Sequence, residues 1–140
     1  MMIPKPTVLI VDDSPMMCRY LGLFLEKRYE VLTYTNSVEA LTLVISGFQP
    51  DLIVTDLDMP NLNGIAFIKA IRKTLPHVPL LVVSGAKKSI ERINALSAGA
   101  DDLITKPFHP AELDVRLNKL IERRELQIPI SNFVQQIRLT

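Results

Sequence analysis

The chain is poor in the features that mark secreted, membrane and nucleic-acid-coating proteins. It has one cysteine, Cys18, which excludes an internal disulfide and is typical of a reducing compartment. Its formal net charge is +1 and no basic run exceeds two residues, which argues against direct nucleic-acid binding. The N-terminal apolar run ends at Asp12, and no segment approaches the roughly 20 apolar residues that span a bilayer. We therefore expect a cytoplasmic protein with no membrane partner.

What the chain does contain is an ordinary globular composition in an alternating pattern. With 140 residues, 48 % hydrophobic and 22 % charged, it is long enough for one domain with a full core. The expected strands cover residues 7–11, 30–34, 51–56, 79–84 and 102–105, and a segment of helical period follows each strand. Successive βα units predict an α/β sandwich with right-handed crossovers. For a doubly wound parallel sheet of this size we expect the flavodoxin-like strand order 2-1-3-4-5.

Acidic residues stand at the ends of two of the apolar runs. Residues 7–11 lead directly into Asp12 and Asp13, and residues 52–55 lead directly into Asp56. Continuous apolar runs are typical of parallel strands that are buried on both faces. In the expected order the first and third strands are neighbours, so three carboxylates would meet at the carboxyl edge as a hard-oxygen cluster suited to Mg²⁺. The alternative is that each aspartate simply caps the helix that follows it.

Two further polar residues are expected at the same edge of the sheet. Ser84 ends the fourth strand, and Lys106 follows the fifth strand. Because the carboxyl ends of parallel strands lie at one edge, the expected order gathers an acidic trio, a hydroxyl group and an ammonium group.

Residues 7–126 resemble the receiver domain of two-component response regulators, including the single-domain chemotaxis regulators. The features that carry the resemblance occur in order: Asp12-Asp13, Asp56 within Val-Thr-Asp-Leu-Asp-Met-Pro, Gly64, Ser84-Gly85 and Lys106-Pro107-Phe108. Each feature is common by itself, but the whole set at the spacing of one α/β domain is specific. The resemblance implies a phosphorylation-activated switch in a phosphorelay, with self-directed phosphotransfer and autodephosphorylation rather than an enzyme activity on an external substrate.

The resemblance also implies roles for the acidic residues. Asp56 would accept a phosphoryl group from a sensor histidine kinase or a histidine phosphotransfer protein. Asp13 and Asp56 would bind Mg²⁺ directly, and Asp12 would bind it through water. The backbone carbonyl of Asp58 would supply another oxygen to the metal, and its side chain would lie near the phosphoryl group.

Ser84 and Lys106 would, by the same resemblance, contact the phosphoryl group. They would transmit its presence to a surface formed by the fourth helix, the fifth strand and the fifth helix. The peptide bond between Lys106 and Pro107 would be cis. One position departs from the family pattern, because Leu103 stands where many receivers carry a tyrosine or phenylalanine that turns inward on activation. With leucine at this position no aromatic ring can turn inward to signal activation, and Ser84 and Lys106 remain as the residues that could move the loop.

Two other functions fit part of the pattern. Asp56-Leu57-Asp58 after a strand also matches the nucleophile and acid/base pair of haloacid-dehalogenase-like phosphatases, but Met-Pro follows here and there is no room for a substrate cap. The second alternative is a pseudo-receiver with an inactive site. The complete set of acidic, hydroxyl and ammonium groups argues against this alternative. As downstream partner we expect an output domain or an effector protein, and a phosphorylation-dependent homodimer is a further option.

The last residues of the chain differ from the rest. We expect a receiver domain over residues 1–126 and an extension or linker over 127–140, because Pro129 interrupts a helix whose periodic residues extend to Leu126. After the proline a second apolar stripe recurs at i, i+3, i+4 and i+7, formed by Ile130, Phe133, Val134 and Ile137. A short helix with such a stripe either packs on a surface of this subunit or of a second copy, or leads into an output domain. The alternative is that the segment is a frayed tail in solution.

Overall fold

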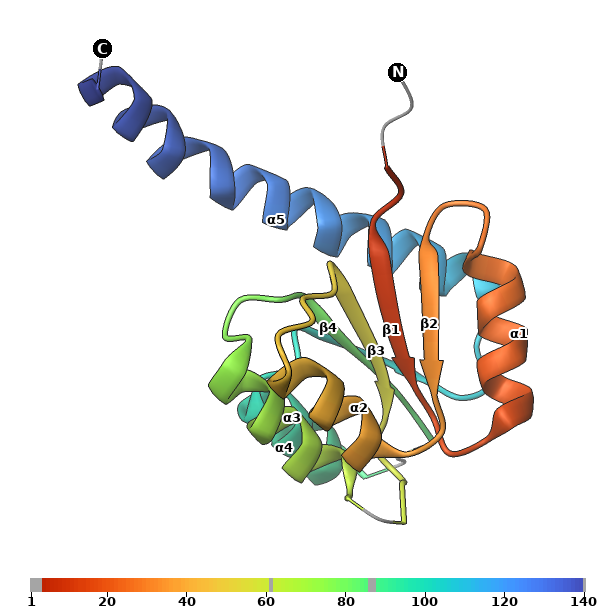
Figure 1. The fold of residues 1–140 in the computed structure, drawn as a ribbon. Coiled ribbons are helices and arrows are strands. Elements are labelled where there is room, and N and C mark those ends of the chain that lie inside the picture. Colours follow the sequence, from red (N-terminus) through yellow and green to blue (C-terminus); the bar gives the residue numbers. More distant parts are fainter. Residues whose placement is uncertain (1–3, 61, 86–87, 140) are drawn as a thin grey trace.

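The computed structural model describes residues 4–60, 62–85 and 88–139, of which residues 125–139 are described by their backbone alone. Strands and helices alternate along these residues (Figure 1). In chain order they are β1 (Thr7–Val11), α1 (Pro15–Leu25), β2 (Glu30–Tyr34), α2 (Ser37–Ile45), β3 (Leu52–Asp56), α3 (Gly64–Thr74), β4 (Leu80–Ser84), α4 (Ser89–Ala98), β5 (Asp102–Thr105) and α5 (Pro110–Leu139).

The strands form one parallel sheet in the order β2-β1-β3-β4-β5, which confirms the expected flavodoxin-like fold class. The register places Val11 of β1 opposite Thr55 of β3, and Asp56 of β3 opposite Val83 of β4. Every residue of β3 and β4 is buried, as expected for central strands covered on both faces. The carboxyl ends of β1, β3 and β4 therefore lie side by side at one edge of the sheet.

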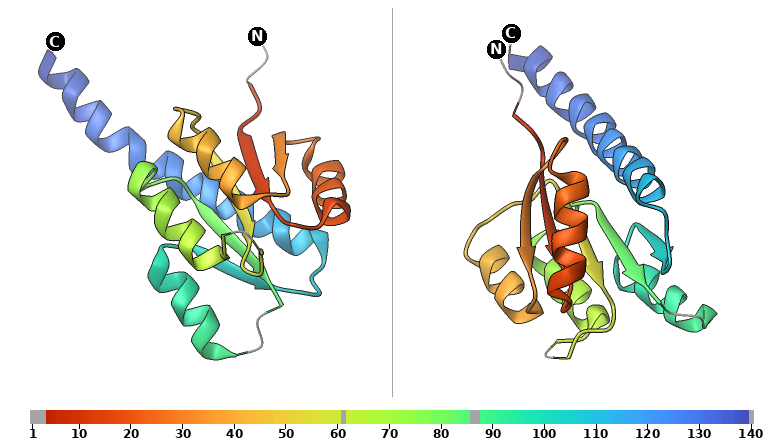
Figure 2. Two further views of the ribbon diagram at one scale, coloured as in Figure 1. Left: turned by 60° about the horizontal axis from the view of Figure 1, so that its bottom comes forward. Right: turned by 90° about the vertical axis from the view of Figure 1, so that its right-hand side faces the viewer.

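Helices cover both faces of the sheet (Figure 2). On one face α1 and α5 pack on the sheet, where Leu21 and Leu117 share a buried cluster with Ile10. On the other face lie α2, α3 and α4, where Phe67 shares a second cluster with Leu9. Successive side chains of a strand point to opposite faces, so Leu9 and Ile10 of one strand belong to different layers.

Polar caps fix the starts of the first three helices. The side chain of Ser14 accepts a hydrogen bond from the Met17 N–H at the start of α1, and Pro15 occupies the first turn. Asn36 and Asn63 cap α2 and α3 in the same way. Because α1 and α3 follow β1 and β3 in the chain, these caps lie on the carboxyl side of the sheet.

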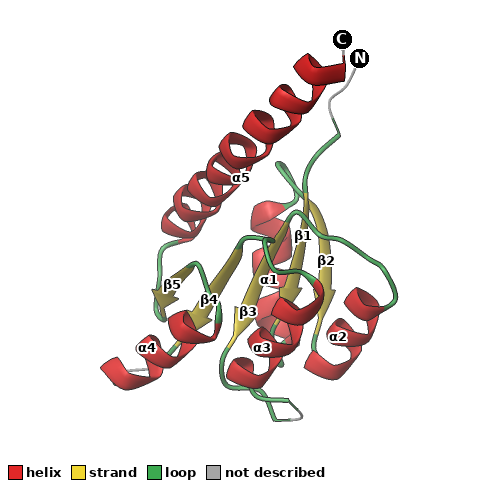
Figure 3. Cartoon of the chain, turned by 90° about the vertical axis from the view of Figure 1, so that its left-hand side faces the viewer, coloured by secondary structure: helices red, strands yellow, loops and turns green. Residues whose placement is uncertain are grey.

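The helix α5 is longer than the sequence pattern indicated. We expected it to end by Leu126, but its backbone continues through Pro129 to Leu139. An interior proline removes one helical hydrogen bond and crowds the preceding turn, which disturbs a helix without always ending it. The C-terminal half of α5 projects beyond the sheet (Figure 3), and the side chains of the apolar stripe after Pro129 lie outside the described residues. Among the described residues, none of the helices combines the length and the hydropathy that a membrane span requires.

Candidate functional site

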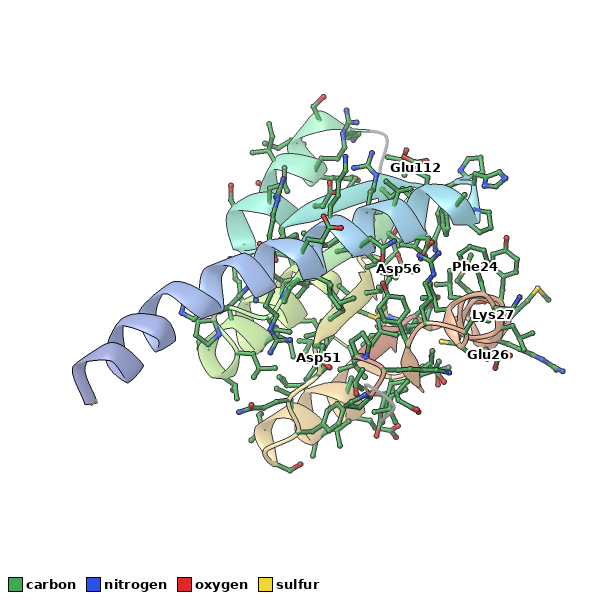
Figure 4. All side chains as sticks on the ribbon, turned by 90° about the horizontal axis from the view of Figure 1, so that it is seen from above. Phe24, Glu26, Lys27, Asp51, Asp56 and Glu112 are labelled. Atoms are coloured by element: carbon green, nitrogen blue, oxygen red, sulfur yellow. The ribbon has the colours of Figure 1, made fainter. Side chains whose placement is uncertain are left out.

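Two neighbouring strands deliver three carboxylates to one edge of the sheet. Asp12 directly follows β1. Asp56, labelled in Figure 4, is the last residue of β3. One carboxylate oxygen from each of Asp12, Asp13 and Asp56 lies within 4.8 Å of the other two. Asp12 and Asp56 are buried, at 3 % and 5 % exposure, whereas Asp13 is exposed. The expected acidic trio is therefore assembled, with Asp13 on its solvent side.

The ammonium group of Lys106 faces this acidic trio. Its Nζ lies 3.5 Å from Asp12 Oδ2 and 3.6 Å from Asp56 Oδ2. The lysine comes from the loop after β5, in which the Lys106–Pro107 peptide bond is cis. Its backbone N–H donates to the Ser84 carbonyl at 2.9 Å, which joins this loop to the end of β4. One lysine beside three carboxylates leaves the cluster with a net negative charge.

The surroundings of Asp56 disfavour its ionised form. Burial raises the pKa of Asp56 above its ordinary value, and Lys106 and the Asp58 N–H oppose this rise only in part. The Asp58 N–H donates to Asp56 Oδ1 at 3.3 Å, and the Ser14 N–H donates to Asp12 Oδ1 at 2.9 Å. Because a buried carboxylate needs a cationic partner, the cluster would gain from a further positive charge. Its donors are carboxylate oxygens alone, which fits a hard divalent cation such as Mg²⁺.

Ser84 occupies the third strand end at this edge. It is fully buried and directly follows Val83, which stands opposite Asp56 in the sheet. The structure therefore places Ser84 one residue beyond the strand partner of Asp56, at the edge where the sequence predicted it.

The loop between β3 and α3 folds tightly over the end of β3. The Gly64 N–H donates to the Leu57 carbonyl at 2.8 Å. A Cβ atom on Gly64 would lie 2.4 Å from Leu57 Cα and 2.8 Å from the Asp56 carbonyl oxygen, so only glycine permits this approach. Met59 of the same loop packs in the core, whereas Asp58 is exposed. The loop is thus held against the strand end, and the Asp58 side chain remains accessible.

Two other side chains with reactive groups have structural contacts. The Cys18 thiol is buried behind the site and donates to the Asp12 carbonyl at 3.3 Å. Burial raises the pKa of Cys18, so its reactive thiolate form is disfavoured. His109 Nδ1 accepts a hydrogen bond from the Ala111 N–H at the start of α5. Both residues support the backbone around the site.

Sequence reasoning missed a polar cluster at the opposite edge of the sheet. Arg72 of α3 donates to the Gly99 carbonyl and to the Asp101 carboxylate, 27 and 29 residues further along the chain. No spacing between neighbouring residues in the sequence predicts such a pair. A single arginine in a helix is normally interpreted as a solvated side chain.

Comparisons with known proteins all point to the same family. Residues 8–118 match the family model described as the response regulator receiver domain. The transcriptional regulatory protein PrrA of Mycobacterium tuberculosis is 39 % identical over 124 residues, and the alkaline phosphatase synthesis transcriptional regulatory protein PhoP of Bacillus subtilis is 34 % identical over 125. These alignments cover 87 % and 89 % of this chain and 52 % of each relative. The chain therefore spans about half the length of the curated relatives it matches.

Solved structures agree with this assignment. The receiver domain of the Francisella response regulator 1452 superposes with a TM-score of 0.79 at 33 % identity, covering 86 % of this chain and 99 % of that one. A response regulator receiver domain protein from Clostridium thermocellum gives a TM-score of 0.82 at 28 % identity, covering 88 % and 99 %. The chain belongs to the receiver domains of two-component response regulators.

Proposed function

We propose that this receiver domain works as a switch in which Asp56 accepts a phosphoryl group and Mg²⁺ is held beside it. The observation that carries the proposal is the cluster of three carboxylate oxygens within 4.8 Å of one another. Two of these carboxylates, Asp12 and Asp56, share one lysine. Asp13 and Asp56 would bind the metal directly, Asp12 would act through water, and the Asp58 carbonyl would complete the protein's share of ligands. When bound, the cation neutralises the charge that a phosphoryl group brings to the carboxylates.

The donor we propose is a phosphohistidine of a sensor kinase or a phosphotransfer protein. An Asp56 carboxylate oxygen attacks phosphorus, and the bond between phosphorus and the imidazole nitrogen breaks with its electron pair returning to the ring. The product is an aspartyl phosphate. Lys106 is already within 3.6 Å of Asp56 and would move its charge toward the phosphoryl oxygens. The Ser84 hydroxyl would donate a hydrogen bond to another of these oxygens.

The signal would leave the site through the two elements that follow Ser84 and Lys106. Ser84 leads toward α4, and Lys106 leads into α5, so movement of either residue reaches the surface of α4, β5 and α5. Leu103 lies in β5 and is partly buried against the core. With leucine at this position, the readout would rest on the β4 and β5 loops rather than on the turning of an aromatic ring.

Phosphorylation of purified protein tests the proposed site. Incubation with acetyl phosphate and Mg²⁺ should add one phosphate to the intact mass of the wild-type protein, and excess chelator should prevent it. Asp56→Asn should give no adduct, because the attacking carboxylate is absent. Asp58→Asn is the matched control, since it leaves the backbone carbonyl in place, and it should still be phosphorylated. An adduct that persists in Asp56→Asn would contradict the assignment, and rapid hydrolysis of a generic phosphate ester would favour the phosphatase alternative.

We further propose that residues 127–140 connect the receiver to a partner or an output domain. Two observations support this role: the C-terminal half of α5 projects from the sheet (Figure 3), and the curated relatives are about twice as long as the matched region. Deletion of residues 129–140 should leave Asp56 phosphorylation intact and change the oligomeric state or partner binding. If the truncated protein does not fold, the segment is part of the domain core and the division at residue 126 is wrong.

A further inference from the structure

The two ends of α4 are held in different ways. At the N-terminal end the capping position is Lys88, which makes no side-chain hydrogen bond to the helix. The starts of α1, α2 and α3 are each capped by a serine or asparagine side chain. Because the first N–H groups of a helix lack intrahelical partners, a start without a side-chain cap among the described residues is the weaker end.

The C-terminal end of α4 is closed by a tight backbone motif. Gly99 adopts a positive φ of 126°, and its N–H donates to the Leu96 carbonyl at 3.1 Å. The Ala100 N–H donates to the Ala95 carbonyl at 3.1 Å. These two bonds form a Schellman-type ending, which satisfies carbonyl groups that a helix otherwise leaves free.

The guanidinium group of Arg72 then ties this ending to the body of the domain. Its Nη2 lies 2.7 Å from the Gly99 carbonyl oxygen and 3.0 Å from Asp101 Oδ2. Its Nη1 donates to the carbonyl groups of Leu75 and Val78 at 3.0 and 2.6 Å. The Arg72 side chain is only 16 % exposed. One side chain therefore joins the ends of α3 and α4 and the loop that enters β4.

Asp101 and Gly99 make this junction rigid. The Asp101 carboxylate oxygen that meets Arg72 also accepts the Leu80 N–H at 2.8 Å, at the start of β4. A Cβ atom on Gly99 would lie 2.7 Å from Arg72 Cγ, so the side chain of the arginine fills the space beside the helix end. Planar guanidinium groups with several donors are suited to such fixed junctions.

The remainder of α4 is only lightly attached. Among its residues Ala95 alone is buried, whereas Ile90 and Ile93 are 57 % and 54 % exposed. A groove of about 420 Å³ separates the first part of α4 from α3 and the β3 loop, with Asp58 and Lys69 on one wall and Glu91 on the other. The N-terminal part of the helix thus has open space on the side that faces the phosphoacceptor loop.

We infer that Arg72 is a positioning residue that anchors the C-terminal end of α4, so that α4 swings about Gly99 when the site is activated. The inference rests on the proposed phosphorylation of Asp56. The anchored end keeps its place beside α3 and β4, and the uncapped end changes its distance from α3 across the groove. The change at the active edge is thereby converted into a tilt of the helix rather than a shift of the whole helix along the surface.

Paired spin labels measure this tilt. One label is placed at Glu39 on α2, which lies in the same layer as α4, and the second at Ser89 or Ser97, all in a Cys18→Ala background. A swing of about 15° over the roughly 12 Å from Ser97 to Ser89 moves the N-terminal end by about 3 Å. With Mg²⁺ and beryllofluoride as the phosphoryl mimic, the 39–89 distance should change by about this amount, and the 39–97 distance should stay constant.

Variants of the junction provide the second readout. In Arg72→Gln or Asp101→Asn the 39–97 distance should broaden and should change with beryllofluoride, because the anchor is weakened. Arg116→Gln is the matched control, since Arg116 pairs with the neighbouring Asp102 but does not contact Gly99 through any described hydrogen bond, and it should behave as wild type. If the Arg72 variant does not fold, the distances in the wild-type protein and in Asp101→Asn still test whether the C-terminal end of α4 is anchored.

The outcomes separate the two proposals. Fluorine NMR reports whether beryllofluoride is bound, independently of any helix movement. Absence of bound fluoride in the wild-type protein would overturn the proposed function, and the swing of α4 with it. Bound fluoride together with equal changes in both distances, or with no change in either, would overturn the anchoring role of Arg72 alone.

Discussion

The two ends of β3 carry aspartates in opposite electrostatic surroundings (Figure 4). Asp51, just before the strand, forms an ion pair with Arg124 at 2.9 Å and accepts the Thr7 N–H at 2.7 Å. Asp56, at the end of the strand, is more deeply buried and shares Lys106 with Asp12 at 3.5–3.6 Å. The first carboxylate is matched by its own arginine, whereas the second belongs to a cluster with more negative than positive charge.

The same contrast extends along both edges of the sheet. At the amino edge, Asp101 pairs with Arg72 and Asp102 pairs with Arg116, each at 3.0 Å. At the carboxyl edge, three carboxylates cluster, and among the described residues one ammonium group pairs with two of them, Asp12 and Asp56. Asp51, Asp101 and Asp102 at the amino edge therefore each have their own arginine, whereas the carboxylates of the carboxyl edge outnumber their cationic partner. We therefore expect removal of a carboxylate to cost stability at the amino edge and cation binding at the carboxyl edge.

The largest effect is expected at Asp51. Asp51→Ala leaves the partly buried Thr7 N–H and Arg124 without their carboxylate, and a hydrogen bond to a charged group contributes about 1.5–3 kcal/mol. We expect urea unfolding to show a loss of about 2 kcal/mol, with phosphorylation of Asp56 retained. Asp58→Ala, an exposed aspartate in a loop, is the control and should change the unfolding free energy by less than about 0.5 kcal/mol. Equal stability of Asp51→Ala and wild type would show that the amino edge does not depend on this pair.

A smaller effect is expected from Mg²⁺ at the carboxyl edge. A ligand that binds only the folded state stabilises it by about 1.4 kcal/mol at ten times its dissociation constant. Thermal unfolding with and without Mg²⁺ should show this gain in the wild-type protein, and Asp13→Asn should lose it. Asp102→Asn, at the amino edge, should keep it. A gain that survives in Asp13→Asn would place the cation elsewhere.

The smallest effect concerns pH and Tyr29, which precedes β2 at the amino edge. Burial raises the pKa of Tyr29 to about 12, and Asp114 adds to the rise. The folded state then keeps the proton after the unfolded chain has lost it, so stability falls as the pH rises from about 10 to about 12. We expect a loss of about 1 kcal/mol by pH 11 from this group, which Tyr29→Phe should remove. Unfolding curves that are equally pH-dependent in both proteins would assign the loss to other groups.

Much of the candidate site was predictable because its signals are local. Asp12 and Asp56 each follow a buried apolar strand directly, and the strand order of a small doubly wound sheet brings those strands together. The surroundings of α1 were less predictable. Tyr20 and Phe24 recur at helical spacing with Leu21, yet they are 48 % and 39 % exposed, whereas Leu21 is buried. Helical period identifies the helix, but the neighbouring elements decide how much of its apolar surface is covered.

By itself, the sequence determined the strands and the aspartates at their ends, because burial, period and turn chemistry act over a few neighbouring residues. The strand order followed from the rule for a small doubly wound sheet. Only the tertiary structure decided which charges are neutralised. Arg124 meets Asp51 across 73 residues of chain, and Arg72 meets Asp101 across 29. It also decided that α5 continues through Pro129, against the local preference of proline. Ion pairs of long side chains depend on which elements the completed core places side by side, and no spacing along the chain records that arrangement.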